Sequence, residues 1–282
     1  MKPLVITAAV VGGELTRQDT PHVPLTPQEI AFECIEVRKA GAHIVHLHAR
    51  DKSGQPKHRV DLFEDIVQEI NQQAQASHLE PPILQFSTGG SVGMTVEERM
   101  APLSLLPEMA TLTTGTVNFG DGIFENSADT MKTLAKALKS KGIAVELEIF
   151  DAGMIDNALR LKRDDLLPEH LHFNFVLGVP GGLSGDLSNL VFLVSRLPSN
   201  ATWGVAGIGR SQLPLAVHAI VSGGHVRVGL EDNIFYRKGE FAKGNRPLVE
   251  RVVRIAAECD RPLATLAQAR DLLGIPLHRR KK

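Results

Sequence analysis

Two histidines separated by one residue, His46 and His48, stand at the end of the apolar run Ile44–His48. Residues two apart on a β-strand face the same side, so both imidazoles point one way while Leu47 points the other. A lone histidine is more often a core residue, but two buried rings at one strand end are costly as packing, because each ring needs hydrogen-bond partners. We therefore interpret His46 and His48 as a pair of metal ligands.

An acidic pair near the other end of the chain, Glu231 and Asp232, follows the apolar run His225–Gly229, which contains Arg227. Taken alone, such a pair most often belongs to a solvated turn, but its position after a buried strand favours a functional role. Glu231 is the candidate third metal ligand. Two histidines and one carboxylate leave coordination positions open, which is typical of a catalytic metal site and not of a closed structural one.

Polar residues also stand at or after the ends of other apolar runs. Glu14 follows the first run, Ser87 ends the third and Thr114 ends the fourth. Glu146 and Glu148 lie two apart in the fifth run and so share one face. They form either an inward carboxylate pair or ion pairs with neighbouring basic groups. The candidate substrate-binding residues are Glu14, Ser87, Thr114, Glu148 and Arg227.

Glycine-rich loops follow the sixth and seventh runs, at Gly178–Gly182 and Gly207–Arg210. Glycines let the backbone approach an anionic ligand closely, and Arg210 adds a cation. Such loops are common after strands, so the signal is weak by itself. We take Arg210 as the candidate contact for an anionic cofactor.

Eight short apolar runs must position these residues, and they are candidates for buried parallel strands. Their starts recur about every 32 residues, which fits a βα unit of roughly 30 residues repeated eight times. The runs are Leu4–Ala9, Ile44–His48, Ile83–Ser87, Ala110–Thr114, Ala144–Phe150, His172–Leu177, Thr202–Ala206 and His225–Gly229.

Helix start and stop signals stand between the runs. Residues Thr26–Glu29 form a capping box with proline at the first helical position, and Gly41 is the expected left-handed end of that helix. A second capping box begins at Thr95, and Ser127–Gly142 bracket a further amphipathic helix. Two more helices are predicted in the C-terminal part, near Pro247–Cys259 and Thr265–Leu273.

This alternation predicts one α/β domain over residues 1–282, a (β/α)₈ TIM barrel with extra C-terminal helices. A doubly wound open sheet is the alternative, but its usual Gly-x-Gly-x-x-Gly turn is missing, since Gly12-Gly13-Glu14 does not match and Gln212 stands where a third glycine is needed. In a closed barrel, strands two and eight both neighbour strand one, and adjacent strands lie about 4.8 Å apart. Glu231 can therefore meet the two histidines.

Composition excludes several classes of protein. The chain has 282 residues, of which 43% are hydrophobic, and its net charge of −1 offers no basic footprint for nucleic acid. The two cysteines, Cys34 and Cys259, exclude a disulfide framework and suit a reducing cytoplasm. No run reaches the roughly 18 apolar residues of a membrane span, and the first run is interpreted as a strand, not a signal sequence. The basic run His278–Lys282 is predicted to be a solvated tail.

Several motifs of the chain resemble those of the β-keto acid cleavage enzymes, a family typified by 3-keto-5-aminohexanoate cleavage. The resemblance extends over nearly the whole chain, and its most specific parts are the His-x-His strand and the eighth strand. It rests on Ile6-Thr7-Ala8-Ala9 with Gly12-Gly13, His46-Leu47-His48-Ala49-Arg50-Asp51, Gln85-Phe86-Ser87-Thr88-Gly89-Gly90, Val117-Asn118-Phe119-Gly120 and Val226-Arg227-Val228-Gly229-Leu230-Glu231-Asp232-Asn233.

The resemblance implies a TIM barrel with Zn²⁺ on the two histidines and one glutamate, usually in a homotetramer. It implies a reaction in which a β-keto acid and acetyl-CoA yield acetoacetate and a new acyl-CoA. The functional serine, arginine and aspartate of the family fall on Ser87, Arg227 and Asp232. The family's acidic residue after strand one falls on Glu14.

The residue types suit that chemistry. A cation that binds the keto and carboxylate oxygens makes the carbon between them acidic. Asp232 can take that proton as general base, and the neighbouring Arg227 is expected to lower the pKa of Asp232 and keep it ionised. Ser87 is expected to donate to an oxyanion or to the substrate carboxylate, because no Gly-x-Ser-x-Gly elbow marks it as a nucleophile.

Other functions stay open on the sequence alone. A metal-dependent C–C lyase or hydrolase can use the same residues without CoA, and a non-catalytic barrel can retain a vestigial metal site. A mononuclear iron oxygenase also uses two histidines and a carboxylate. The acyl group is not specified either: a cationic substrate needs an acidic pocket group such as Glu14 or Glu148, and a plain acyl group needs only apolar walls.

Overall fold

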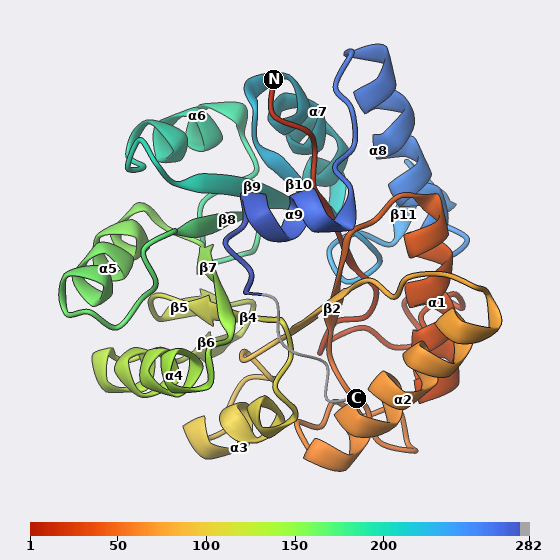
Figure 1. Cartoon of the computed structure of the whole chain (residues 1–282), viewed down its shortest axis with the longest axis horizontal. Helices are drawn as coiled ribbons and strands as arrows, with labels where there is room; N and C mark the ends of the chain where they lie inside the picture. Colours follow the sequence, from red (N-terminus) through yellow and green to blue (C-terminus); the bar gives the residue numbers. More distant parts are fainter. Residues whose placement is uncertain (277–282) are drawn as a thin grey trace.

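Eight parallel strands close into a barrel in the computed structural model, which describes residues 1–276 (Figure 1). Around the barrel the order is β1-β10-β9-β8-β7-β4-β3-β2, so strands that follow one another along the chain are neighbours. Each strand overlaps one predicted run, which confirms the TIM barrel and excludes the open sheet. The strands are β1 (Ile6–Ala9), β2 (Ile44–Leu47), β3 (Ile83–Phe86), β4 (Met109–Thr113), β7 (Ala144–Ile149), β8 (His172–Leu177), β9 (Thr202–Gly207) and β10 (His225–Val228).

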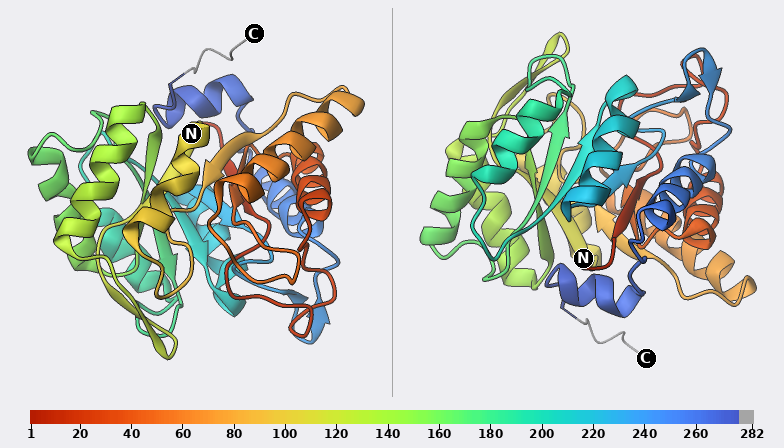
Figure 2. Two further views of the ribbon diagram at one scale, coloured as in Figure 1. Left: turned by 90° about the horizontal axis from the view of Figure 1, so that it is seen from below. Right: turned by 90° about the horizontal axis from the view of Figure 1, so that it is seen from above.

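Helices surround the barrel, and the connections between the main strands carry them (Figures 1 and 2). The helix α8 occupies the position after the eighth barrel strand, and α9 lies beyond it. The helices are α1 (Pro27–Ala40), α2 (Val60–Ala76), α3 (Val96–Met100) with the 3₁₀ turn η1 (Ala101–Leu105), α4 (Ala128–Lys141), α5 (Ala152–Arg163), α6 (Leu187–Ser195), η2 (Gly209–Ser211) with α7 (Gln212–Ser222), α8 (Arg246–Glu258) and α9 (Leu266–Leu272).

The predicted helix signals work as expected. The Thr26 side chain accepts a hydrogen bond from the backbone of Glu29 and the Glu29 carboxylate accepts one from the backbone of Thr26, which completes the capping box of α1. Gly41 ends that helix at φ 114°, a left-handed conformation that favours glycine. A second capping box starts α3 at Thr95, and Ser127 caps α4. Local chemistry therefore sets where these helices begin and end.

One end of the barrel is closed by α9. Leu266 and Ala269 of α9, with Leu273 just after the helix, pack with apolar side chains from the beginnings of the strands, among them Ile44 and Ile83. Figure 2 shows α9 lying across this end. The opposite end, where the strands terminate, is the end that carries the candidate residues.

Two short hairpins were absent from the sequence-based prediction. One is formed by β5 (Val117–Phe119) and β6 (Gly122–Phe124), and the other by β11 (Phe235–Arg237) and β12 (Glu240–Phe241). Strands of two or three residues are too short to show an alternating pattern. Both hairpins follow the ends of barrel strands, β4 and β10 respectively.

Two further points concern the extent of the chain. Across residues 1–276, no helix combines the length and the apolar character needed to cross a bilayer. The predicted basic tail, His278–Lys282, lies outside the described residues.

Candidate metal and active site

The three candidate metal ligands lie together at the open end of the barrel. Their ligand atoms are all within 4.8 Å of one another. Glu231 Oε1 lies 3.7 Å from His46 Nε2 and 3.6 Å from His48 Nε2. The strand order explains this meeting, because β1 separates β10 from β2 and both flank it. Two atoms bound to one ion at about 2.1 Å in a tetrahedral arrangement lie about 3.4 Å apart, close to these spacings.

The surroundings of the cluster also fit a cation. Gln85 Oε1 accepts a 2.7 Å hydrogen bond from His46 Nδ1, which leaves the lone pair of Nε2 directed at the cluster. Burial, with the nearby charge of Arg227, lowers the pKa of His46 to about 4 although Glu231 opposes the shift, so the imidazole is in its neutral, ligating form. Glu231 Oε2 is buried and finds no hydrogen-bond partner within residues 1–276. A divalent cation would satisfy these atoms.

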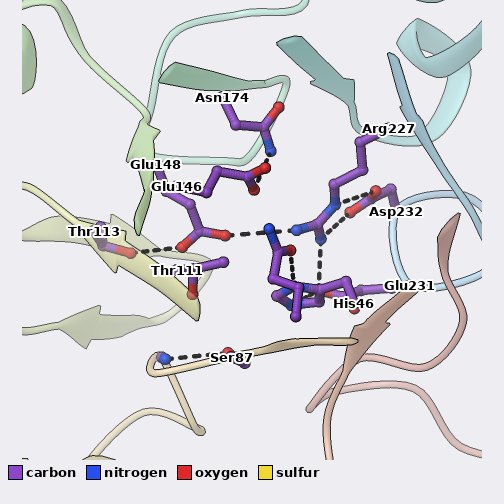
Figure 3. A network of polar contacts seen from close by, with 12 residues as sticks. His46, Ser87, Thr111, Thr113, Glu146, Glu148, Asn174, Arg227, Glu231 and Asp232 are labelled. Carbon is purple, nitrogen blue, oxygen red and sulfur yellow. Dashed lines mark hydrogen bonds and ion pairs between the residues drawn. The ribbon is translucent and has the colours of Figure 1, made fainter. Parts of the chain in front are cut away.

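Arg227 connects the candidate metal ligand Glu231 to the candidate base Asp232 (Figure 3). It is 5% exposed, and its Nε and Nη2 each donate a 2.9 Å hydrogen bond to the Asp232 carboxylate. The same Nη2 donates to Glu231 Oε1 at 2.7 Å, and Nη1 lies 3.5 Å from Glu148 Oε1 on β7. One guanidinium therefore donates hydrogen bonds to two carboxylates and forms an ion pair with a third, and all three face the same space.

Arg227 lowers the pKa of Asp232 as expected, but the expected net direction of the pKa shift is wrong. Burial raises the pKa of Asp232 to about 6, and the attraction of Arg227 only partly offsets it. The same guanidinium also stabilises the ionised form of Glu231. Burial opposes that ionisation, but Arg227 and the two histidines hold the pKa of Glu231 well below its ordinary value. Of the two neighbouring carboxylates, Glu231 has the character of a ligand and Asp232 that of a proton acceptor.

Glu146 and Glu148 both point into the barrel from β7, but their environments differ. Glu146 lies deeper: it accepts a 3.2 Å hydrogen bond from Asn174 Nδ2 and is 3.5 Å from His172 Nε2. Glu148 faces the cavity and accepts a 2.8 Å hydrogen bond from Thr113 Oγ1. Burial, with the negative charges of Glu146 and Glu231, raises the pKa of Glu148 to about 7.

This raised pKa predicts how stability depends on pH. The folded protein holds the Glu148 proton more tightly than the unfolded chain does, so ionisation of Glu148 costs stability as pH rises from 4.5 to 7. Each pKa unit corresponds to about 1.4 kcal/mol, so Glu148→Gln should gain roughly 2–3 kcal/mol over the wild type between pH 5 and pH 8. Urea unfolding of the metal-free proteins at both pH values measures it. If the free energies of unfolding of the two proteins changed equally with pH, the raised pKa of Glu148 would be contradicted.

The candidate residues line a cavity of about 670 Å³. Eight of the ten sequence-predicted site residues belong to it: Glu14, His46, His48, Ser87, Glu148, Arg227, Glu231 and Asp232. Thr114 and Arg210 do not line it. The Thr114 hydroxyl donates to the Met154 carbonyl at 2.9 Å, and Arg210 lies exposed in η2. The cavity instead receives Ile208, two residues before Arg210.

Ser87 is placed as a hydrogen-bonding group. Its Oγ accepts a 3.1 Å hydrogen bond from the Gly89 backbone N–H, so the hydroxyl proton is available to a ligand in the cavity. The Ser87 carbonyl in turn accepts a 2.7 Å hydrogen bond from His58 Nε2. His58 was not identified from the sequence, because it stands alone in a polar segment before α2 and no spacing marks it.

The hairpin β5–β6 supplies part of the cavity wall. Phe119 and Phe124 line the cavity from this hairpin, and Asp121 lines it from the turn between the strands. Phe150, whose ring centroid lies 6.3 Å from that of Phe119, and Val176 continue the apolar lining. The site is therefore a polar floor at the strand ends beneath largely apolar walls, the usual form of a small-molecule site.

Comparison with known proteins gives consistent results. A family model described as beta-keto acid cleavage enzyme matches residues 3–275. The 3-keto-5-aminohexanoate cleavage enzyme of Acetoanaerobium sticklandii is 45% identical over 276 residues, 98% of this chain and 99% of the relative. The 3-oxoadipate:acetyl-CoA acetyltransferase of Cupriavidus necator is 38% identical over 278 residues, 98% of this chain and 96% of the relative.

A solved structure shows the same fold. ObcA, in a ternary complex with a C4-CoA adduct and oxalate, superposes with a TM-score of 0.77 at 24% identity. The match covers 90% of this chain and 68% of that chain. At this level of identity the likeness concerns the barrel alone.

Proposed function

The chain belongs to the β-keto acid cleavage enzyme family, and on that premise we propose that it converts a β-keto acid and acetyl-CoA into acetoacetate and a new acyl-CoA. The observation that carries the proposal is the contact of one guanidinium, Arg227, with both the candidate ligand Glu231 and the candidate base Asp232. Relatives whose names specify acetyl-CoA support the co-substrate. Zinc and a homotetrameric assembly are further parts of the proposal that rest on the family resemblance. A cytoplasmic location is also proposed, and it rests on the two cysteines, which suit a reducing compartment.

The roles of the residues follow from their positions. A divalent cation held by His46, His48 and Glu231 would supply Lewis acidity that polarises the keto and carboxylate oxygens of the substrate. Asp232 takes a proton from the carbon between those two groups, and Arg227 balances the negative charge that develops. Ser87 donates its hydroxyl proton to an oxygen of the substrate.

The carbon–carbon steps need no nucleophile from the protein. The enolate carbon attacks the acetyl thioester, and the CoA thiolate leaves. That thiolate then attacks the original keto carbon, which breaks the older carbon–carbon bond and forms the new acyl-CoA. Asp232 returns its proton to the departing carbon, and acetoacetate results. The cavity lining contains no cysteine among residues 1–276, which agrees with a reaction whose nucleophiles come from the substrates.

The charge of the cavity favours a substrate with a cationic substituent. Glu14, Asp121 and Glu148 line it in addition to Glu231 and Asp232, whereas Arg227 is the one lysine or arginine among the lining residues of the described chain. A relative 45% identical is named for an amino-substituted β-keto acid. We propose the same class here, with a cationic group near Glu148, where it would favour the ionised carboxylate.

Labelled acetyl-CoA tests the proposed reaction. Acetoacetate should receive its keto and methyl carbons from acetyl-CoA and its carboxyl and methylene carbons from the β-keto acid. The assay should be run on pairs of β-keto acids that carry an amino group or a methyl group at the same position. The amino member should have a kcat/KM about 10- to 100-fold higher, the value of one hydrogen bond to a charged group.

Two results would redirect the proposal. Product formation without acetyl-CoA would indicate a lyase or hydrolase that uses the same metal residues. If the amino and methyl members of each pair gave labelled acetoacetate with equal kcat/KM, the proposed reaction would stand. The proposed preference for a cationic substrate would then be wrong.

A further inference from the structure

The hydrogen-bond ladder between β1 and β10 ends just before it reaches the metal cluster. Its last paired residues are Ala8 and Val228. Gly229 follows at φ 154°, and a Cβ there would lie 2.1 Å from the Ala9 carbonyl oxygen, so the two backbones touch. The N–H of Glu231 returns to that carbonyl at 3.2 Å. The N–H of Leu230, directed elsewhere, needs another partner.

A side-chain amide from a distant part of the chain supplies that partner. Asn245 Oδ1 accepts a 2.7 Å hydrogen bond from the Leu230 N–H, and Asn245 Nδ2 donates a 3.1 Å hydrogen bond to the Val10 carbonyl. The side chain is completely buried. The planar amide of Asn245 thus directs its acceptor toward the end of β10 and its donor toward the end of β1. It takes the place of the next backbone hydrogen bond between the two strands.

Asn245 reaches this position instead of capping its own helix. It is the N-cap residue of α8, where an asparagine side chain normally accepts a hydrogen bond from the first turn, yet it makes no such bond. Glu33 on α1 holds it from behind: Glu33 Oε2 accepts hydrogen bonds from Asn245 N at 2.7 Å and from Nδ2 at 2.8 Å. The helices α1 and α8 lie next to each other in Figure 1.

Glu231 comes directly after the residue that Asn245 holds. On its other side the backbone of Gly12 is so close that a Cβ there would lie 2.6 Å from Glu231 Cγ. The Glu231 side chain is thus confined on one side by Gly12 in the loop after β1, while Asn245 fixes the backbone of the preceding residue, Leu230. We propose that Asn245, supported by Glu33, is a positioning residue that directs Glu231 toward His46 and His48; this rests on the metal site of the proposed function.

Metal affinity measured with zinc alone tests the positioning role. In Asn245→Asp the acceptor for Leu230 remains, but the donor to Val10 is lost and a second carboxylate faces Glu33. Zinc affinity, measured by competition with a chelator, should fall roughly 10- to 100-fold, the usual cost of losing an outer partner of a ligand. The double variant Asn245→Asp/Glu33→Gln removes the repulsion between the two carboxylates and gives the new carboxylate a donor. It should recover part of that affinity, while the Val10 carbonyl stays without its donor.

Cobalt(II) provides a second readout that a general loss of stability would not change in the same way. Its visible absorption reports ligand geometry, so the Asn245→Asp spectrum should differ from that of the wild type and shift back toward the wild-type spectrum in the double variant. The matched control is Asn157→Ala, which removes a 2.7 Å hydrogen bond from an asparagine to the Thr114 carbonyl at another strand end. It should keep the affinity and the spectrum of the wild type.

The outcomes separate the inference from the function on which it rests. Unchanged zinc affinity in Asn245→Asp, an equal loss in Asn157→Ala, or no recovery in the double variant would overturn the positioning role. If Asn245→Asp does not fold, Glu33→Ala at its half-buried position loosens Asn245 without changing it, and a several-fold loss of zinc affinity is expected. A wild-type protein that binds no zinc would overturn the metal site itself.

Discussion

His46→Ala is expected to remove both the bound metal and the turnover of the enzyme. The purified wild type should carry about one first-row divalent metal per chain, and zinc is the expected ion. The two ligands left in the variant are His48 and Glu231, and they hold a catalytic ion poorly because three protein ligands are the usual number. The loss of affinity should exceed the roughly 10- to 100-fold cost of an outer-sphere change. Elemental analysis after dialysis measures the metal content, and acetoacetate release measures the turnover.

A buried histidine just before the same strand provides the matched control. His43 precedes β2, is 2% exposed, and its ring nitrogens contact the backbone of Ile6 and Ala264. His43→Ala should lower the free energy of unfolding while retaining the metal. Full metal occupancy in a His46→Ala/His48→Ala double variant would show that the ion binds elsewhere.

The convergence of the three candidate metal ligands could be predicted from the sequence because it follows from periodicity and topology alone. The two-residue repeat of a strand puts His46 and His48 on one face. Closure of the barrel puts β10 and β2 on either side of β1, and Glu231 follows β10. Neither step requires knowledge of any side-chain contact.

Residues beyond a strand end were less predictable, because the direction of a loop is set by contacts distant in sequence. Thr114 stands one residue after β4 and turns to the Met154 carbonyl, away from the cavity. Arg210 stands after β9, but η2 carries it to the surface. Asn245 binds the Leu230 N–H from 15 residues away along the chain, and Gln85 binds His46 from 39 residues away. The local sequence around Asn245 or Gln85 does not indicate either contact.

The direction of the Asp232 pKa shift could not be predicted, because two opposing effects act on this pKa and only one of them is visible in the sequence. The neighbouring Arg227 suggests a lowered pKa. The burial of the carboxylate, and the sharing of that guanidinium with Glu231, appear only in three dimensions. The net result is a carboxylate that accepts a proton more readily than an exposed aspartate does.

Asp232→Asn is expected to retain the metal and lower kcat by a factor of roughly 10² to 10⁴, the usual contribution of a general base. An amide has nearly the shape of the carboxylate and its oxygen can still accept from Arg227, so the metal content should change little. The loss should lie in proton abstraction. In deuterated buffer without acetyl-CoA, the wild type should exchange the protons between the keto and carboxylate groups faster than the uncatalysed background, and the variant should not.

The neighbouring residue makes the comparison decisive, because Glu231→Gln changes the same chemical group one position earlier in the chain. If the roles are as proposed, Glu231→Gln loses metal and activity together, whereas Asp232→Asn loses activity alone. If Asp232→Asn instead releases the metal while Glu231→Gln retains it, the two carboxylates have been given each other's roles. Near-normal turnover and proton exchange in Asp232→Asn would remove Asp232 from the mechanism. Glu148 would then be the carboxylate to test next, because it faces the same cavity and its raised pKa also suits a proton acceptor.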